Sequence, residues 1–505
     1  MKLTPLAPTI AALFLLSACG GSSNSATSTP LPTPAPDLGI ATQYQGNWQA
    51  PGYGMSISIS SDALKLYQFT SDYCLLSVDE DDVDTQDIES LLQTTDDTAR
   101  IEWTAGFGTP SIAAPGIYFE KTPELPQSCQ TNAIDMTEGT NNVLDSLELW
   151  ELYGQIFSEY YLDFSLKNID WQQLHHDAGQ SLQSDSSALD LINAMYTTLE
   201  VLADGHNAVV APQGWSVKFT TKPTLKERLV EEFANENNLP YPITEEYVTQ
   251  DLLDEINEFT QAHLANQWEL TANYAADESE IKTSADGLIR WFENQGLGYL
   301  YIGGMLGYAD ASSLDQQAYA QATIDAVNQA LDLALTDLSS VNGLIIDVRT
   351  NDGGHDFVSL AIASRFTDSD VHVYSKQARD GESRTPMRDV QITPYDGTTY
   401  TGPIALLTSS STVSAAEVFT LSMSNLPNVT LIGEATHGAF SDVLDWTLPN
   451  GFKLQLSNEY YLSPLGDWYE GQGVPVDIHA PFYLPEHREA EIDLAIEMAI
   501  EVLAQ

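Results

Sequence analysis

Basic residues are scarce in this chain. It carries 19 lysines and arginines against 72 aspartates and glutamates, so its formal net charge is −53. Nucleic acids and anionic lipid headgroups bind proteins through clusters of basic side chains, and a surface this acidic disfavours both. The composition therefore predicts no nucleic-acid partner, and it predicts that any attachment to a membrane depends on something other than a basic patch.

The chain also lacks a hydrophobic run of membrane-spanning length. The apolar stretch near its start is interrupted by Pro5 and Pro8, whereas a transmembrane helix needs ~20 apolar residues. The stretch ends in small residues before Cys19, which is the pattern of a lipoprotein signal peptide with a lipidated cysteine. We expect residues 1–18 to be removed and Cys19 to carry the lipid.

The residues that follow Cys19 predict a tether, and the signal pattern predicts where the protein is located. Residues 19–42 are rich in Ser, Thr and Pro, a composition that cannot form a packed core. We expect a bacterial lipoprotein that is anchored only through its N-terminal lipid and faces the periplasm. Since no Asp follows Cys19, its resemblance to lipoproteins of this kind indicates the outer membrane.

Cysteine is also rare in this chain. Beyond Cys19 the chain has only Cys74 and Cys129. In an oxidising compartment this pair favours a disulfide that closes a small N-terminal domain and stabilises it by ~4 kcal/mol. Two separate buried thiols remain the alternative. No motif for a cofactor or a metal is recognised, and we expect neither.

Hydrophobic periodicity divides the rest of the chain. Alternation of apolar and polar residues over 43–135 predicts a small β domain, and helical spacing dominates 136–215 and the insertion over 216–290. Strands then alternate with helices over 291–485, which is typical of an α/β domain, and an amphipathic helix closes the chain over 486–505.

Ser414 lies where a strand is expected to end and a helix to begin. Residues 403–408 (PIALLT) are apolar, a serine-rich turn follows, and helical spacing starts at Ala415. At such a junction unpaired backbone amides lie beside the serine hydroxyl, as a nucleophile requires. The alternative is an ordinary helix cap, because Ser414 and Glu417 have the spacing of a capping box.

Four blocks give this serine a context. They are residues 199–206 (LEVLADGH), 343–354 (GLIIDVRTNDGG), 430–438 (TLIGEATHG) and 469–477 (YEGQGVPVD). In this order they resemble the tail-specific (C-terminal processing) protease and tricorn-core family of serine peptidases, over about residues 143–212 and 296–481. The resemblance implies a crotonase-like α/β catalytic domain preceded by the helical segment.

The same resemblance assigns roles within the blocks. It implies that Ser414 is the nucleophile and that the amides of Gly353 and Ala415 form the oxyanion hole, with Gly354 as an alternative for the first donor. The turn at 351–354 suits this role, because its glycines let the backbone bend sharply with exposed amides.

The resemblance implies that the general base is a histidine. Tail-specific proteases have a lysine after the third block, but this chain has Ala439 there, which excludes a Ser–Lys pair. The tricorn branch uses a histidine and a glutamate, which correspond to His206 and Glu470. Gly205 stands where that branch has a serine. His437 is a rival base, although we interpret it as a surface-loop residue.

The sequence thus predicts a serine endopeptidase that acts on peptides or proteins of the cell envelope. The alternative is a non-catalytic, ligand- or peptide-binding lipoprotein, since some relatives, such as the retinoid-binding modules of the interphotoreceptor matrix, bind apolar ligands on this fold. The combination of Ser414, His206, Glu470 and the glycine pair favours the peptidase. No PDZ-like run of strands is recognised in 216–290, so the family name is not extended to recognition of substrate C-termini.

Overall fold

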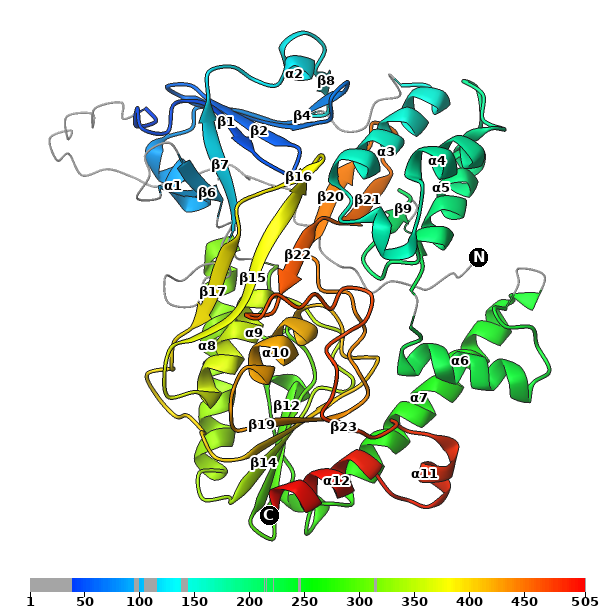
Figure 1. Ribbon diagram of the computed structural model, residues 1–505, viewed down its shortest axis with the longest axis vertical. Coiled ribbons are helices and arrows are strands. Elements are labelled where there is room, and N and C mark those ends of the chain that lie inside the picture. The colour runs from blue at the N-terminus through cyan, green and yellow to red at the C-terminus, as the bar shows by residue number, and fades with distance from the viewer. Residues whose placement is uncertain are drawn as a thin grey trace, which may run out of the picture.

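The structure is a computed structural model that describes residues 39–94, 100–103, 116–137, 144–212, 214, 216–220, 222–243, 247–312 and 316–504. Its N-terminal sheet lies at one end and a large α/β sheet at the other, with helices α6 and α7 to one side (Figure 1). The predicted signal peptide, Cys19 and most of the tether lie outside the described residues. No helix among the described residues is both long and apolar enough to cross a membrane.

The N-terminal domain is an eight-stranded sheet in the order β5-β6-β7-β1-β2-β3-β4-β8. The alternating strands predicted here bury Trp48, Ile57 and Ile59 in its core. Cys74 and Cys129 form a disulfide, with the two sulfurs 2.08 Å apart, that joins β4 to α2. The elements are β1 (Gly46–Ala50), β2 (Met55–Ile59), β3 (Ala63–Phe69), β4 (Cys74–Asp81), α1 (Thr85–Leu91), β5 (Leu92–Thr94), β6 (Arg100–Trp103), β7 (Ile117–Thr122), α2 (Gln127–Thr131) and β8 (Ile134–Asp135).

The predicted helical segment follows, and it is joined to the C-terminal half by a shared sheet. Its elements are α3 (Ser146–Tyr160), the 3-10 turn η1 (Phe164–Lys167), α4 (Trp171–Gly179), α5 (Ala188–Leu202), β9 (Ala208–Val210) and β10 (Ser216–Lys218). β9 pairs with β21 (Lys453–Ser457), which pairs with β20 (Val443–Thr447). This sheet brings the end of α5 close to residues that are more than 230 positions later in the chain.

The α/β domain has a seven-stranded sheet in the order β11-β12-β13-β14-β18-β19-β23. β13, β14, β18, β19 and β23 run parallel, so their carboxyl ends meet at one edge. The elements are α6 (Leu225–Glu236), α7 (Gln250–Ala272), η3 (Glu278–Glu280), β11 (Lys282–Ser284), η4 (Ala285–Gly287), β12 (Ile289–Asn294), β13 (Leu297–Ile302), α8 (Gln316–Asp337), β14 (Gly343–Asp347), α9 (Asp356–Ala363), η5 (Ser364–Phe366), β18 (Ile404–Thr408), α10 (Ala415–Ser424), β19 (Val429–Gly433) and β23 (Ile478–His479).

Helices cover both faces of this sheet. Leu344 and Ile346 of β14 point into a core with α8, α9 and α10, whereas Ile345 points into a second core with α12 (Leu494–Leu503). Successive residues of a strand face opposite sides, so the continuous apolar run in β14 is that of a strand buried on both faces. A further sheet contains β15 (Val371–Asp380), β16 (Ser383–Arg384), β17 (Arg388–Ile392) and β22 (Glu459–Leu462). The predicted α/β class is confirmed.

Two expectations need correction. The closing helix expected over 486–505 is divided into α11 (Pro485–Glu489) and α12, with Glu491 at φ 54° between them. The break occurs because Asp493 caps α12 and also binds Arg349, which fixes the start of that helix against the sheet. The boundary expected at residue 291 falls inside β12, and the sheet already begins with β11.

Candidate active site

Ser414 lies at the turn between β18 and α10, in a strained backbone conformation. Its φ of 58° and ψ of −128° are rare for an L-residue and persist only where surrounding contacts enforce them. The Ser414 amide donates to the carbonyl of Ala439 at 3.1 Å and to Oε2 of Glu417 at 3.2 Å. These contacts hold the half-buried side chain at the start of the helix.

Glu417 does more than the helix cap that its spacing predicts. Its side chain is fully buried, and burial raises its pKa to about 7. Both carboxyl oxygens accept hydrogen bonds. The donors are Thr436 Oγ1 (2.6 Å), the Gly438 amide (2.6 Å), the Ala439 amide (2.7 Å) and the Ser414 amide. Glu417 therefore joins the Ser414 turn to the segment that follows β19.

The glycine turn after β14 touches the Ser414 turn. Gly353 has φ 96°, and a Cβ on it would lie 2.7 Å from the Ser414 Cβ and 3.0 Å from the Ala415 nitrogen. Only glycine fits this approach. The Gly353 amide donates to Oδ1 of Asn351 at 2.9 Å. Within the described part of the chain, the amides of Gly354 and Ala415 donate to no protein acceptor.

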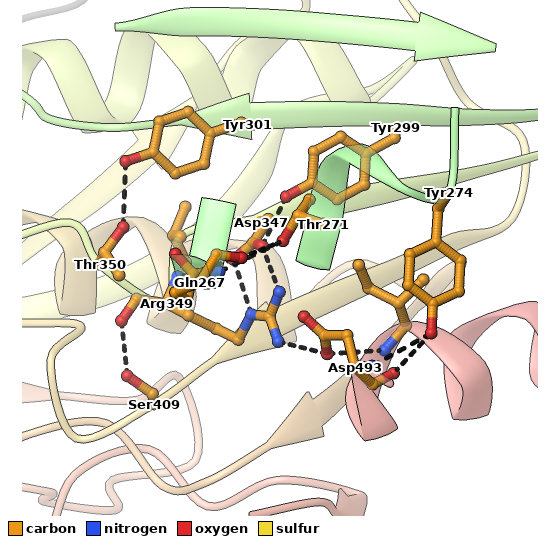
Figure 2. Close-up of polar contacts among 12 residues, drawn as sticks. Gln267, Thr271, Tyr274, Tyr299, Tyr301, Asp347, Arg349, Thr350, Ser409 and Asp493 are labelled. Atoms are coloured by element: carbon orange, nitrogen blue, oxygen red, sulfur yellow. Dashed lines mark hydrogen bonds and ion pairs between the residues drawn. The ribbon is translucent and has the colours of Figure 1, made fainter. Parts of the chain in front are cut away.

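A buried ion pair fixes both turns to one anchor (Figure 2). Arg349 donates through Nη2 to Asp347 at 2.6 Å and through Nη1 to Asp493 at 2.7 Å, and its guanidinium is 1% exposed. Tyr299 donates to the same Asp347 carboxylate. Ser409, in the turn before Ser414, donates to the Arg349 carbonyl. Charge-assisted bonds of this geometry are strong and directional, so the turns after β14 and β18 keep their relative position.

His206 follows α5 in a short turn. The helix ends at Ala203, which has a left-handed conformation, and the next side chain, Asp204, accepts a hydrogen bond from the His206 amide at 2.9 Å. Asp204 also accepts from the hydroxyls of Tyr161 and Ser457, both at 3.1 Å. Because Ser457 belongs to β21, Asp204 fastens the His206 turn to the C-terminal half.

The His206 ring is buried. Nδ1 has no hydrogen-bond partner among the described residues. Burial, and secondarily the positive charges of Lys218 and His437, lower the pKa of His206 to about 4, whereas Asp204 and Asp442 act in the opposite direction. His206 is therefore neutral at physiological pH, which is the form that a general base requires.

Glu470 lies close to the same elements but does not contact His206 directly. It is 2% exposed, and its Oε2 accepts hydrogen bonds from the amides of Phe440 and Ser441, both at 3.2 Å. Burial, and secondarily the negative charge of Asp204, raise the pKa of Glu470 well above its usual range. Across the described residues, no hydrogen bond joins His206 to Ser414 or to Glu470.

The three predicted residues converge on one segment, residues 437–441, which we call the site segment. Its Ala439 carbonyl holds the Ser414 amide, and its amides at 440 and 441 hold Glu470. A Cβ on Gly205 would lie 3.2 Å from both the Ala439 Cβ and His437 Nε2, so the His206 turn packs against the same segment. A cavity of about 120 Å³ opens here, lined among others by Tyr161, Lys167, Asp204, Gly205, His437 and Glu470.

His437 is not the surface-loop residue that the sequence suggested. It is only 4% exposed, and Nδ1 lies 3.0 Å from the carbonyl of Ser410. A carbonyl can only accept, so Nδ1 carries the proton and Nε2 is left as an acceptor beside Gly205. Burial lowers the pKa of His437. The sequence suggested exposure because glycine-rich turns usually lie at the surface. Here the His206 turn, which is distant in sequence, packs against His437 and buries it.

Three further residues of the site were not singled out by the sequence. Lys218 in β10 lies close enough for its charge to lower the pKa values of both histidines. Ser441 and Asp204 hold the neighbouring turns through hydrogen bonds. Asp204 stands inside the first block of the resemblance, residues 199–206, and could have been noticed there, whereas Lys218 and Ser441 carry no local signal.

Comparisons with known proteins relate the α/β part of the chain to peptidases. Residues 297–480 match the sequence model described as "Peptidase family S41". The chain is 22% identical over 170 residues to the carboxy-terminal processing protease CtpA of Bacillus subtilis, covering 34% of each chain. It is 26% identical over 186 residues to carboxyl-terminal-processing peptidase 2, chloroplastic, of Arabidopsis thaliana, covering 37% of this chain and 34% of that one. The chain thus spans about a third of the length of these curated relatives.

A solved structure resembles the fold over a larger part. A putative peptidase from Parabacteroides merdae superposes with a TM-score of 0.53 at 21% identity, covering 72% of this chain and 97% of the other. At this identity the match supports the fold of the chain, and the chemistry must be argued from the site itself.

Proposed function

We propose that the protein is a serine endopeptidase acting on peptides or proteins of the cell envelope, from the premise that residues 297–480 match the sequence model of peptidase family S41. Ser414 is the proposed nucleophile, His206 the general base and Glu470 the supporting carboxyl group. The observation that carries the proposal is the contact between the Gly353 turn and the strained Ser414 turn. A Cβ added to Gly353 would lie only 2.7 Å from the Cβ of Ser414.

This contact places backbone amides beside the hydroxyl. When Ser414 Oγ attacks a peptide carbonyl, the carbonyl oxygen gains negative charge, and unpaired amides oriented toward it lower the barrier. The Ala415 amide is one such donor. Since the Gly353 amide is engaged by Asn351, the Gly354 amide is favoured as the second donor over that of Gly353.

In the proposed reaction the imidazole of His206 carries the proton of Ser414. His206 accepts the Ser414 proton as the C–O bond forms and returns it to the amine that leaves when the C–N bond breaks. Its low pKa keeps it ready as a neutral base, and catalytic hydrogen bonds often close only when substrate binds. The negative charge of Asp204 favours the protonated form of His206 and so stabilises the imidazolium ion that forms transiently, and Glu470 fixes the site segment through the amides of Phe440 and Ser441.

Substrate recognition is proposed without a C-terminal anchor. The curated relatives are named for carboxy-terminal processing, but the described residues between β10 and β11 form the helices α6 and α7 and the 3-10 turn η3. We therefore propose an endopeptidase whose cleavage does not depend on the substrate's free carboxylate. We further propose that Cys19 carries the lipid that holds the protein to the periplasmic side of the envelope, at the outer membrane.

The function is tested by labelling and hydrolysis. The full-length protein in detergent should react with a fluorophosphonate at Ser414, as located by peptide mass mapping, and should cleave an unstructured protein such as casein. Ser414→Ala should abolish both while its circular dichroism and melting temperature stay unchanged. Absence of labelling in a folded wild-type protein would instead favour the non-catalytic binding protein.

A further inference from the structure

The N-terminal β domain reaches into the catalytic half through the turn between β1 and β2, residues 51–54. Gly52 has φ 80°, and a Cβ on it would lie 2.6 Å from the carbonyl of Arg379. The Gly52 carbonyl accepts a hydrogen bond from Nδ2 of Asn458 at 3.2 Å. The next residue, Tyr53, is only 7% exposed. In Figure 1 the N-terminal sheet accordingly lies next to β15 and β16. Residues 51–54 are therefore packed closely against the C-terminal half of the chain.

Tyr53 binds a buried carboxylate at the start of β22. Its hydroxyl donates a short hydrogen bond to Oε1 of Glu459, which is 2% exposed. The other oxygen of Glu459 contacts Nζ of Lys376 at 3.0 Å. Lys376 also contacts Asp442 at 3.2 Å. A buried carboxylate is costly unless both of its oxygens have partners. The Tyr53 hydroxyl is the partner of one oxygen of Glu459, and Lys376 is the partner of the other.

Ser441 connects Glu459 to the candidate catalytic carboxyl group. It is fully buried, and its Oγ accepts hydrogen bonds from the amides of Asn458 at 2.8 Å and Glu459 at 3.0 Å. The same hydroxyl donates to the Asp442 carbonyl at 2.7 Å. The Ser441 amide donates to Oε2 of Glu470. Three hydrogen bonds, connected through the covalent bonds of Glu459 and Ser441, therefore lead from Tyr53 to Glu470.

From this series we propose that Tyr53 is a positioning residue of the active site, and that the N-terminal β domain thereby fixes the place of Glu470. The proposal rests on the proposed peptidase function. Among the described residues, the Glu470 carboxyl group accepts hydrogen bonds only from the backbone amides of Phe440 and Ser441. A displacement of Ser441 therefore displaces Glu470, and an active site tolerates little such displacement.

The test removes the Tyr53 hydroxyl and keeps its ring. Tyr53→Phe should lower kcat about tenfold and change KM less than twofold, because Tyr53 is buried and its hydroxyl is bound to Glu459. In a Glu470→Gln background the same substitution should have no further effect on kcat, since the residue through which it acts is already impaired. For slow variants, the second-order rate of fluorophosphonate labelling gives the same comparison.

Tyr160→Phe is the matched control. Tyr160 is 5% exposed, and its hydroxyl donates to the carbonyl of Phe69 in the N-terminal sheet at 2.7 Å. It makes a comparable contact between the domains outside the hydrogen-bond series, so it should lower the melting temperature about as much as Tyr53→Phe and leave kcat unchanged.

Three results would overturn the inference: an unchanged kcat in Tyr53→Phe, an equal loss of kcat in Tyr160→Phe, or a full further loss when Tyr53→Phe is added to Glu470→Gln. If wild type is no faster than Ser414→Ala, the proposed function fails and the inference fails with it. A wild type that is clearly faster, together with any of the three results, overturns the inference alone.

Discussion

The pH dependence of hydrolysis tests the assignment of His206 most directly. The acidic limb of kcat/KM reports the pKa of the base in the free enzyme. An exposed histidine would place this limb near pH 6.5. Burial and the charge of Lys218 lower the pKa of His206 to about 4, so we expect activity to stay level from pH 8 to about pH 6 and to reach half its maximum only near pH 4.

The perturbation is Lys218→Met, which removes one of the two charges that lower this pKa. The limb should then move to higher pH, but it should stay below 6.5 because burial remains the larger cause. Lys282→Met is a control for the loss of one positive charge, because Lys282 is exposed and paired with Asp337 far from the site. Its limb should coincide with that of wild type.

The same pKa has a consequence for stability. Between pH 6.5 and about 4 the unfolded chain binds a proton at His206 that the folded chain does not, so this group favours unfolding increasingly as the pH falls. The difference of about 2.5 in pKa corresponds to about 3 kcal/mol once the pH is below the folded value. Each acidic rate must therefore be checked by returning the enzyme to pH 7 and recovering full activity.

Variants then decide which group is titrating. His206→Ala should remove the acidic limb together with most of the activity, whereas His437→Ala should retain the limb. A wild-type limb near pH 6.5, or an unaltered profile in His206→Ala, would refute the reasoning. If only His437→Ala removed the limb, His437 would be the base.

Three further predictions concern the turns and the anchor. Gly353→Ala should lower kcat by about 100-fold with the fold retained in circular dichroism, because φ 96° and the 2.7 Å approach to Ser414 exclude a side chain; wild-type kcat would contradict this close contact. Glu417→Gln should destabilise the protein by about 2 kcal/mol in urea titrations, because an amide NH₂ must then face donors now bound to a carboxyl oxygen, and an unchanged midpoint would count against it. Cys19→Ala should move the protein from the membrane fraction to the soluble periplasmic fraction, since stable anchoring depends on its acyl chains; unchanged fractionation would mean another attachment.

The sequence was sufficient where the site depends on neighbouring parallel strands. β14 and β18 are adjacent, so the turns that follow them, with Gly353 and Ser414, lie at one sheet edge, and their apolar runs identify both strands. It was insufficient where a site residue depends on pairing between distant segments. The approach of His206 to the site segment comes from β9 pairing with β21, and no local pattern specifies which strand a three-residue strand will join. The link from Tyr53 to Glu459 was missed for the same reason, because the two residues are 406 positions apart in the chain.

The places where the chain departs from its family resemblance are explained by one packing arrangement. Gly205 replaces a serine, Ala439 replaces a lysine, and His437 occupies the turn between them. A Cβ at position 205 would meet His437 Nε2 and the Ala439 Cβ at 3.2 Å, a separation at which neighbouring atoms must shift. A buried histidine at 437 thus favours glycine at 205, and the small side chain at 439 leaves the His206 turn room to pack beside the Ser414 amide. A lysine at 439 would compete for that space, so the proposed base must be a side chain other than that of residue 439, and the imidazoles of His206 and His437 are the groups that the fold brings there.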